Sequence, residues 1–230
     1  MRIAVISDIH SNLEAFQAVI ADFPKHDHLL FLGDLVGYGP QPNEVIEQLR
    51  QLQPAIVLMG NHDYAVSTGD VSGFSAHAEI GVMWTRGQIE LENRNYLSSR
   101  TSSATIELDK IRSALFHGSP RDSLNEYIFP GISARSAREL IQRARAPLVL
   151  LGHTHMPMSY SFNGEMLANP GSVGQPRDGD PRAAYAILTI AEGESSFEVR
   201  RVTYDIGSVA KKIIEAGLPK FLADRLYAGM

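Results

Sequence analysis

The chain has 230 residues, no cysteine and a formal net charge of -5, with 44% hydrophobic and 20% charged residues. This length is sufficient to bury a sizeable core, and the composition is typical of a soluble globular protein. The lack of cysteine excludes disulfides, thiolate zinc sites and cysteine nucleophiles. The acidic balance gives no support to nucleic acid or an anionic membrane surface as a partner.

The N-terminal segment Met1–Asp8 contains an apolar run that is too short for a signal-peptide core, and a carboxylate interrupts it. No apolar stretch elsewhere approaches the length of a membrane span. We therefore predict a cytoplasmic protein. Since no repeat, low-complexity tract or linker divides the sequence, we predict a single domain over residues 1–230.

Three apolar, β-rich segments alternate with two helical patterns in the first part of the chain. The segments are residues 2–7, 28–32 and 55–59. Their continuous apolar character predicts buried strands. The first helix starts near Ser11 and Glu14, which have the spacing of a capping box, and the second follows Gly39 and Pro40. This βαβαβ order implies parallel strands with right-handed crossovers.

The rest of the chain adds helices and further strands. A helix in the middle of the chain places four apolar side chains on one face, namely Ala76, Ile80, Met83 and Trp84. Strand pairs are predicted where apolar or alternating runs are joined by turn signals. The remaining strands are residues 101–108 with 111–116, 148–151, 158–162 with 166–168, and 183–190 with 196–204. Further helices are predicted over residues 133–146 and, as two short ones, over 206–226.

Five short polar segments, most of them directly after a predicted strand, hold five of the eight histidines. They are Ser7-Asp8-Ile9-His10, Gly33-Asp34, Gly60-Asn61-His62-Asp63, Phe116-His117-Gly118 and Gly152-His153-Thr154-His155. In parallel α/β sheets, ligands collect at the carboxyl ends of strands, so we expect these segments to meet. If each strand continues, the two residues of Asp8-x-His10 point the same way, as do those of His153-x-His155. Glycines beside them would allow sharp turns that aim the ligands inward.

Taken one at a time, these pairs are weak signals. An isolated Asp-x-His is usually incidental, a Gly-Asp is usually a turn, and a single His near a strand end is more often structural. Their joint occurrence favours a metal cluster, because several buried carboxylates and imidazoles without metal would carry a large desolvation cost. Two divalent metals in such a cluster activate water against a phosphate ester.

With these motifs the chain resembles the calcineurin-like metallophosphoesterase superfamily. The pattern is Asp-x-His, Gly-Asp-x4-Gly, Gly-Asn-His-Asp, a lone His and Gly-His-x-His over residues 8–155. The longer segments Asp8–Asn12 and Asn169–Val173 resemble the small prokaryotic phosphodiesterases of the YfcE type. The resemblance implies an α/β fold, a four-layer α/β/β/α sandwich with two mixed central sheets.

The resemblance also implies two metal sites with seven ligands. Asp8, His10 and His155 would hold the first metal, Asn61, His117 and His153 the second, and Asp34 would bridge both. The expected cofactors are therefore two divalent metal ions. Mn or Fe is the family expectation and Zn or Ni the alternative, since oxygen and imidazole ligands alone do not discriminate among these metals.

Three consecutive residues, Asn61, His62 and Asp63, are the predicted catalytic residues. The resemblance implies that His62 lies beside the substrate and protonates the leaving oxygen. Asp63 either orients His62 by a carboxylate–imidazole hydrogen bond or caps a helix.

Arg121, Arg177 and Tyr38 are the predicted substrate-binding residues, since an arginine can hold a phosphate through paired hydrogen bonds. The alternative is that Arg121 and Arg177 are solvated surface residues that do not contact the substrate. We expect residues 70–100 to form a helical cap over the site and His77 to be peripheral. The apolar residues of the two C-terminal helices either pack on the core or form a homodimer interface.

The function implied is a dinuclear-metal-dependent phosphoesterase that hydrolyses small phosphodiesters or phosphomonoesters through a metal-activated water. The alternatives are a hydrolase of dinucleoside polyphosphates or cyclic nucleotides, and a metal-binding scaffold without catalysis. Leu35–Tyr38 stands where the protein phosphatases of this superfamily carry an Asp-Arg pair, which favours a small phosphoester or nucleotide as substrate.

Overall fold

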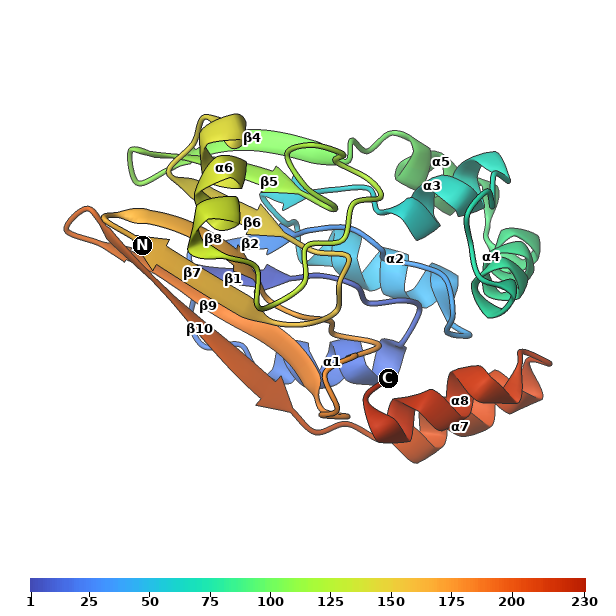
Figure 1. Cartoon of the computed structure of the whole chain (residues 1–230). Coiled ribbons are helices and arrows are strands. Elements are labelled where there is room, and N and C mark those ends of the chain that lie inside the picture. Colours follow the sequence, from blue (N-terminus) through green and yellow to red (C-terminus); the bar gives the residue numbers. More distant parts are fainter.

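The computed structural model describes all residues from Met1 to Met230 and contains two five-stranded sheets packed face to face (Figure 1). The first sheet has the order β10-β9-β1-β2-β3 and the second the order β4-β5-β6-β8-β7. The strands of the first sheet are β1 (Arg2–Ile6), β2 (His28–Phe31), β3 (Ile56–Val57), β9 (Ala183–Ala191) and β10 (Glu194–Val202). Those of the second are β4 (Ser103–Leu108), β5 (Ile111–Phe116), β6 (Leu148–Leu151), β7 (Met158–Phe162) and β8 (Glu165–Asn169).

Both sheets mix parallel and antiparallel pairs. In the first sheet, β1, β2 and β3 are parallel, whereas β9 is antiparallel to both β1 and β10. In the second, β5, β6 and β8 are parallel and the edge strands β4 and β7 are antiparallel to their neighbours. The predicted βαβαβ unit and the two mixed sheets are thereby confirmed.

Side chains alternate between the two faces of β1 and so reach two separate cores. Ile3 and Val5 are fully buried in a cluster that also contains Leu115 of β5 and Leu150 of β6, so this cluster lies between the sheets. The alternate residues Ala4 and Ile6 face the other way and belong to a cluster on the outer side of the first sheet. Two sheets that share an apolar interior in this way form the centre of a sandwich.

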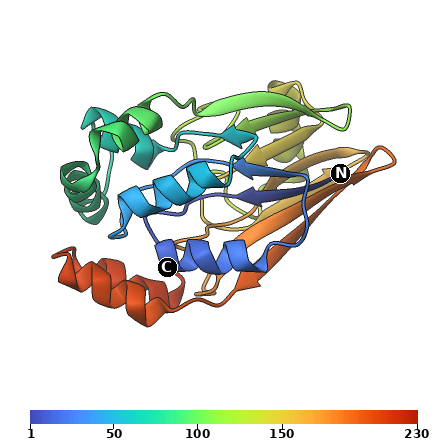
Figure 2. The same ribbon diagram turned by 180° about the vertical axis from the view of Figure 1, so that it is seen from behind.

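Helices cover both outer faces of this sandwich (Figures 1 and 2). The first sheet is covered by α1 (Leu13–Asp22) and α2 (Pro42–Gln51), whose apolar residues join the outer cluster around β1 and β2. The second sheet is covered by α6 (Ala134–Ala144), which packs on β6 and β8. The predicted four-layer α/β/β/α sandwich is therefore confirmed.

The remaining helices form two groups beyond the carboxyl ends of β1 and β2 (Figure 1). One group is α3 (Asn61–Thr68), α4 (Ala76–Gln88) and α5 (Leu91–Ser98), and the other is α7 (Ile206–Glu215) and α8 (Lys220–Ala228). The groups touch where Trp84 Nε1 donates a hydrogen bond of 3.0 Å to the carbonyl of Ala216. Of the apolar residues predicted to share one face of α4, Ile80 and Met83 are half exposed, and the buried residues of the helix are Ala78, Gly81, Val82 and Thr85.

The first helix begins one residue later than its sequence indicated. Asn12, not Ser11, is the N-cap, and its Oδ1 accepts a hydrogen bond of 3.1 Å from the amide of Ala15. Ser11 has a φ of 54° and therefore belongs to the preceding left-handed turn. The capping-box prediction with Glu14 was wrong because Ser11 is used in that turn.

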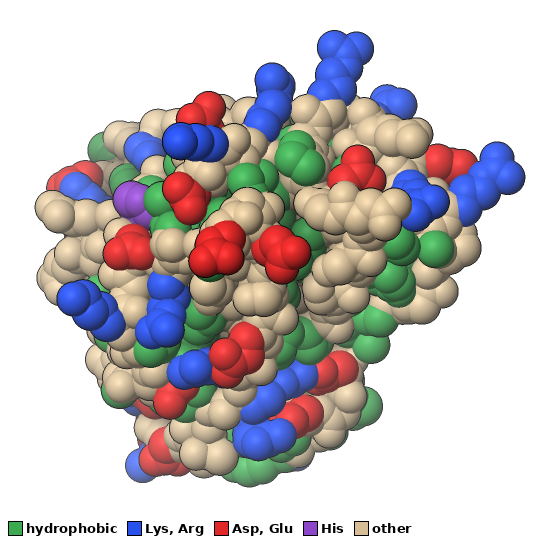
Figure 3. Space-filling view, turned by 90° about the vertical axis from the view of Figure 1, so that its left-hand side faces the viewer, with side chains coloured by type: hydrophobic (Ala, Val, Ile, Leu, Met, Phe, Trp, Pro, Cys, Tyr) green, Lys and Arg blue, Asp and Glu red, His purple; other side chains and the backbone are tan.

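The surface opposite the helical groups carries charges of both signs. Figure 3 shows Lys, Arg, Asp and Glu side chains interspersed on this face, without a continuous region of one sign. Such a surface lacks the basic stripe that binds a nucleic-acid backbone. None of the helices combines the length and apolar character needed to cross a bilayer.

Candidate active site

The five polar segments of the sequence meet at the carboxyl ends of the central strands. Asp8 and His10 follow β1, Asp34 follows β2, and Asn61 opens α3 just after β3. In the second sheet, His117 follows β5, while His153 and His155 follow β6. All seven of these side chains are buried.

These side chains form two groups that share Asp34. One group is Asp8, His10, Asp34 and His155, the other is Asp34, His117 and His153, and the ligand atoms within each group lie within 4.8 Å of one another. Asp34 Oδ2 lies 3.6 Å from His10 Nε2 and 3.4 Å from His117 Nε2, so one oxygen faces both groups. Asn61 joins the second group, with its Oδ1 at 3.2 Å from His117 Nε2.

Backbone carbonyls fix the orientation of the imidazole rings. Three rings place Nδ1 against a carbonyl oxygen, in the pairs His10 with Val36 at 3.1 Å, His117 with Leu32 at 2.8 Å and His155 with Gln175 at 2.6 Å. A ring that donates from Nδ1 keeps Nε2 free as a ligand, which is the usual arrangement around metals. His153 is turned the other way, with Nε2 at 3.1 Å from the carbonyl of Asn125, so that Nδ1 is its free nitrogen.

Two carboxylate oxygens in this cluster have no hydrogen-bond donor. They are Asp8 Oδ1 and Asp34 Oδ2, both buried. Leaving a buried oxygen of a carboxylate unpartnered is costly. A divalent cation between these oxygens and the free imidazole nitrogens would satisfy both, so the residues present fit a metal centre.

The charges of the cluster are strongly coupled. Burial raises the pKa of Asp8 to about 7. Burial also disfavours the Asp34 carboxylate, but the attraction of His117 and His62 outweighs it and holds the pKa of Asp34 well below its usual value. Burial opposes the charged form of His117 as well, yet the neighbouring Asp34 raises its pKa to about 9. Because a metal binds the neutral imidazole, metal binding at His117 would oppose this shift and favour release of a proton.

The backbone around the ligands is left-handed rather than extended. Five ligand residues have positive φ, namely Asp8 at 56°, His10 at 50°, Asp34 at 59°, His153 at 67° and His155 at 60°. Each such residue costs about 1–2 kcal/mol, and strain of this kind is concentrated at functional sites. The expectation that continuing strands align the ligand pairs was wrong, because β1 ends at Ile6 and β6 at Leu151.

The segment Asn169–Val173 supports the ligand turns from behind. Asn169 Nδ2 donates a hydrogen bond of 2.6 Å to the carbonyl of Gly152, and Ser172 Oγ donates one of 2.7 Å to the carbonyl of Asp8. The amide of Val173 donates to Ser7 at 3.0 Å. These bonds are directed to the backbone of the ligand turns, so the segment holds the strained turns in place.

His62 lies beside the cluster and has an uncommitted nitrogen. Its ring centroid is 4.8 Å from that of His10 and 4.4 Å from that of Tyr38, and Nδ1 has no hydrogen-bond partner. Burial lowers the pKa of His62 to about 4. A buried imidazole with a free nitrogen can exchange a proton with a group that enters the site.

Asp63 does not contact His62 by a hydrogen bond, which corrects its predicted orienting role. Its carboxylate accepts from the amides of Leu35 at 2.9 Å, Val36 at 3.1 Å and Gly60 at 3.0 Å. The bond to Gly60 closes the capping box of α3. Asp63 thus ties α3 to the turn after β2, the helix-cap alternative.

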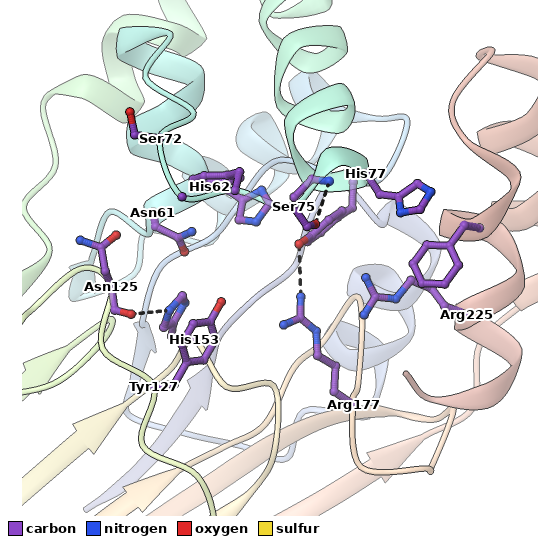
Figure 4. A pocket seen from close by; sticks show the side chains of 15 residues that line it. Asn61, His62, Ser72, Ser75, His77, Asn125, Tyr127, His153, Arg177 and Arg225 are labelled. Atoms are coloured by element: carbon purple, nitrogen blue, oxygen red, sulfur yellow. Dashed lines mark hydrogen bonds between the residues drawn. The ribbon is translucent and has the colours of Figure 1, made fainter.

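A cavity of about 650 Å³ opens beside Asn61, His62 and His153 (Figure 4). Tyr38 and Arg177, the predicted substrate-binding residues, line it together with residues 72–75, 77 and 78, which belong to the segment 70–100 predicted to form a cap. The prediction for Arg121 was wrong, because this exposed side chain pairs with Glu126 at 2.6 Å and does not line the cavity.

Several residues that line this cavity were not predicted from the sequence. They are Phe74, His77, Asn125, Tyr127, Phe221 and Arg225. His77, expected to be peripheral, stacks on Phe221 with the ring centroids 4.6 Å apart. For Phe221 and Arg225, the i, i+4 spacing on α8 could have indicated that the two side chains lie on the same helix face.

Comparison with known proteins adds to this geometry. The family profile described as "Calcineurin-like phosphoesterase superfamily domain" matches residues 1–193. The chain belongs to this superfamily. A metallophosphoesterase structure from Sphaerobacter thermophilus is 38% identical with a TM-score of 0.87, and covers 100% of this chain and 99% of its own. An uncharacterized protein of Methanocaldococcus jannaschii is 35% identical over 99% of this chain and 98% of its own length.

The phosphodiesterase YfcE of Escherichia coli is a more distant relative. It is 26% identical over 82% of this chain and 87% of its own length. The predicted superfamily is confirmed, and with it the prediction that the chain is a phosphoester hydrolase. The superfamily is metal-dependent, in agreement with the buried ligand groups around Asp34.

A substitution at Gly60 tests whether the close approach of this residue to Asp34 positions the metal ligands. A Cβ at this position would lie 2.0 Å from Asp34 Oδ1 and 2.3 Å from the Asp34 amide. We expect Gly60→Ala to displace Asp34, to lower the metal content and to destabilise the protein by about 1–3 kcal/mol. Metal analysis and thermal unfolding measure both effects.

Gly87→Ala is the matched control, because a Cβ there meets no atom within 4 Å. Gly87 lies in α4, where alanine is the better helix former, so this variant should equal or exceed the parent in stability. Normal metal content in Gly60→Ala would show that the contact with Asp34 is not needed for the site.

Proposed function

We propose that the protein is a dinuclear-metal phosphoesterase that hydrolyses small phosphodiesters or phosphomonoesters. Asp8, His10, Asp34 and His155 would hold one metal, and Asp34, Asn61, His117 and His153 the other. The observation that carries the proposal is Asp34 Oδ2, a buried oxygen without a donor that faces histidines of both groups. Manganese or iron is the proposed metal.

When bound, the two metals supply positive charge for the phosphate oxygens and an activated water for attack on phosphorus. The protein contributes the rigid placement of their ligands. The Nδ1 contacts of three histidines fix the rings before substrate arrives, and the hydrogen bonds from Asn169 and Ser172 hold the strained turns. Such preorganisation lowers the cost of reaching the transition state.

His62 is the proposed proton donor to the leaving oxygen. It is not a ligand of either group and it borders the cavity, and because its buried Nδ1 faces Gly37, Nε2 is the nitrogen available to a substrate. Arg177 lines the same cavity and is placed to bind phosphate oxygens through its guanidinium. Tyr38 accepts a hydrogen bond of 3.3 Å from Arg177 Nη2 and so helps to orient it.

The size of the cavity supports a small substrate. About 650 Å³ lies in the range of pockets that enclose a small molecule. Its walls come from the cap segment before α4, the loop that carries Asn125 and Tyr127, and α8. These three walls leave room for a nucleotide, whereas a folded protein substrate calls for an open groove.

The test is hydrolysis by metal-free protein after addition of Mn²⁺, Fe²⁺, Zn²⁺, Ni²⁺ or Mg²⁺. The substrates are bis(p-nitrophenyl) phosphate, p-nitrophenyl phosphate and diadenosine tetraphosphate. Metal-dependent release of nitrophenol supports the proposal, and the ratio of the two nitrophenyl rates separates diester from monoester chemistry. Cleavage of diadenosine tetraphosphate alone would favour the dinucleotide alternative. Tight metal binding without any turnover would favour a scaffold.

A further inference from the structure

Two arginines converge on one tyrosine ring in the active-site cavity. The Cζ atoms of Arg177 and Arg225 lie 5.9 Å and 5.6 Å from the centroid of the Tyr38 ring. Figure 4 shows Arg177 between the metal-ligand side, with Asn61 and His153, and the end of the cavity that holds Arg225. The cavity is therefore positively charged beyond the metal centre.

Neither arginine pairs with an Asp or Glu side chain. Arg177 Nη2 donates to Tyr38 at 3.3 Å and to Gln175 Oε1 at 3.1 Å, and its Nε is buried without a partner. Arg225 donates from Nε to a backbone oxygen of Met230, the last residue of the chain. No Asp or Glu lines the cavity. By contrast, Arg121 outside the cavity is paired with a glutamate.

Two cations in a partly buried wall that holds no Asp or Glu are unfavourable until an anion joins them. Burial is the main cause that lowers the pKa of Arg225 to about 10, and repulsion by Arg177 adds to it. A phosphate between the two guanidiniums would remove the repulsion and accept the free N–H groups, the geometry for which arginine is suited.

The arginine pair is adjacent to the metal ligands but separate from them. The Tyr38 ring, which both guanidiniums approach, is 4.8 Å from the ring of His10, and the Arg177 amide donates to the carbonyl of His155 at 3.3 Å. Because the metals would hold the oxygens of the scissile phosphate, the arginines are available for another anionic group of the same substrate.

Half-exposed aromatic rings stand on the walls of the same cavity. Tyr127 is 45% exposed and stacks on His153, and Phe221 is 43% exposed and stacks on His77. Rings at the edge of a charged pocket suit a nucleobase, because every base offers an apolar π-face. Phe221 and Arg225 belong to α8, beyond residues 1–193 that match the superfamily profile. The C-terminal helices therefore add their own residues to the shared catalytic domain.

We propose that Arg177 and Arg225 bind a second phosphate of the substrate, so that the preferred substrate is a nucleotide that carries a phosphate besides the scissile one. This inference rests on the proposed phosphoesterase function and specifies its substrate class. α8 is then a specificity element, and its removal from the cavity would leave a less selective enzyme.

A matched pair of chromogenic esters tests this preference. The substrates are thymidine 5′-(p-nitrophenyl phosphate) and the same ester with an additional 3′-phosphate, which share the scissile bond and the leaving group. We expect kcat/KM of the parent protein to be about 10- to 100-fold higher for the ester with the additional phosphate. Arg225→Gln should bring this ratio close to one.

Lys220→Gln is the control, since it removes a charge from the exposed face of the same helix, where Lys220 pairs with Asp224. It should keep the ratio of the parent protein. Arg225→Lys should keep part of the ratio, because the charge remains while the planar fork is lost. A ratio that is the same in the parent and in Arg225→Gln would contradict an Arg225 phosphate site.

Binding measurements distinguish failure of this inference from failure of the proposed hydrolysis. Calorimetry compares thymidine 3′,5′-bisphosphate with thymidine 5′-monophosphate, and ADP with AMP, so that two phosphate spacings are sampled. If the ligands with two phosphates bind more tightly than those with one, and this difference depends on Arg225, but no ester is hydrolysed, the phosphate site is supported and the phosphoesterase function is rejected. If the protein hydrolyses the esters but a second phosphate raises neither kcat/KM nor affinity through Arg225, the phosphate site is rejected and the phosphoesterase function still stands.

Discussion

The Asp34→Asn variant is expected to lose bound divalent metal and hydrolytic activity together. Asp34 Oδ2 is the only ligand atom placed to face both groups, at 3.6 Å from His10 Nε2 and 3.4 Å from His117 Nε2. An amide keeps the shape and can still accept the hydrogen bond of 2.8 Å from the His62 amide, but it removes the negative charge. Loss of the metals' charge stabilisation should lower turnover about 10³-fold or more. Plasma emission spectrometry and the nitrophenyl assays measure the two losses.

Asp109→Asn is the matched control for this change. Asp109 lies in the turn between β4 and β5 with a φ of 47°, a conformation that asparagine tolerates well. This variant should keep the metal content and turnover of the parent protein. If Asp34→Asn retained two metals per chain and full turnover, Asp34 would not be the shared ligand.

The position of the ligands could be predicted because it follows from strand order. Asp8 and Asp34 come directly after neighbouring parallel strands, and the carboxyl ends of such strands meet at one edge. The left-handed turns that aim the side chains could not be predicted, because long-range bonds hold them. The amide of Asp8 donates to Gly33 at 2.9 Å, and that of His10 donates to Asp34 at 3.1 Å.

The residues that line the cavity beside the ligands were only partly predicted, for a related reason. Tyr38 follows the predicted ligand Asp34 by four residues, whereas Arg177 lies far from the ligands in sequence and was proposed because an arginine can hold a phosphate. Arg225 lies on an amphipathic helix near the C-terminus. The apolar spacing of such a helix predicts that one face is buried, but it does not predict which part of the protein that face contacts. Arg121 shows the reverse case. It follows His117 closely in the sequence, but its side chain points away from the cavity and pairs with Glu126.

The second large effect is expected for His62→Gln, which should keep metal but turn over slowly. A general acid contributes about 10²–10⁴-fold, and the loss should be of this size for a substrate with a poor leaving group. Glutamine fills similar space and can donate a hydrogen bond, but it cannot transfer a proton. Metal content and kcat for an alkyl phosphodiester are the two measurements.

The leaving group separates proton donation from a structural role. p-Nitrophenolate departs readily without a proton, whereas an alkoxide needs one, so His62→Gln should affect the alkyl ester far more than the nitrophenyl ester. Equal losses on both esters would indicate that His62 positions the substrate or shapes the cavity. His28→Gln, an exposed position at the start of β2, should change neither rate.

Burial sets a condition on this role, because it lowers the pKa of His62 to about 4. At neutral pH the ring is then uncharged until a negative group approaches it. A bound phosphate favours the protonated ring and raises the pKa of His62, so the acid is formed as the substrate enters. Above that raised pKa the ring loses its proton, and kcat for the alkyl ester should fall as pH rises. In His62→Gln this alkaline decline should be absent, whereas its persistence would assign the decline to another group.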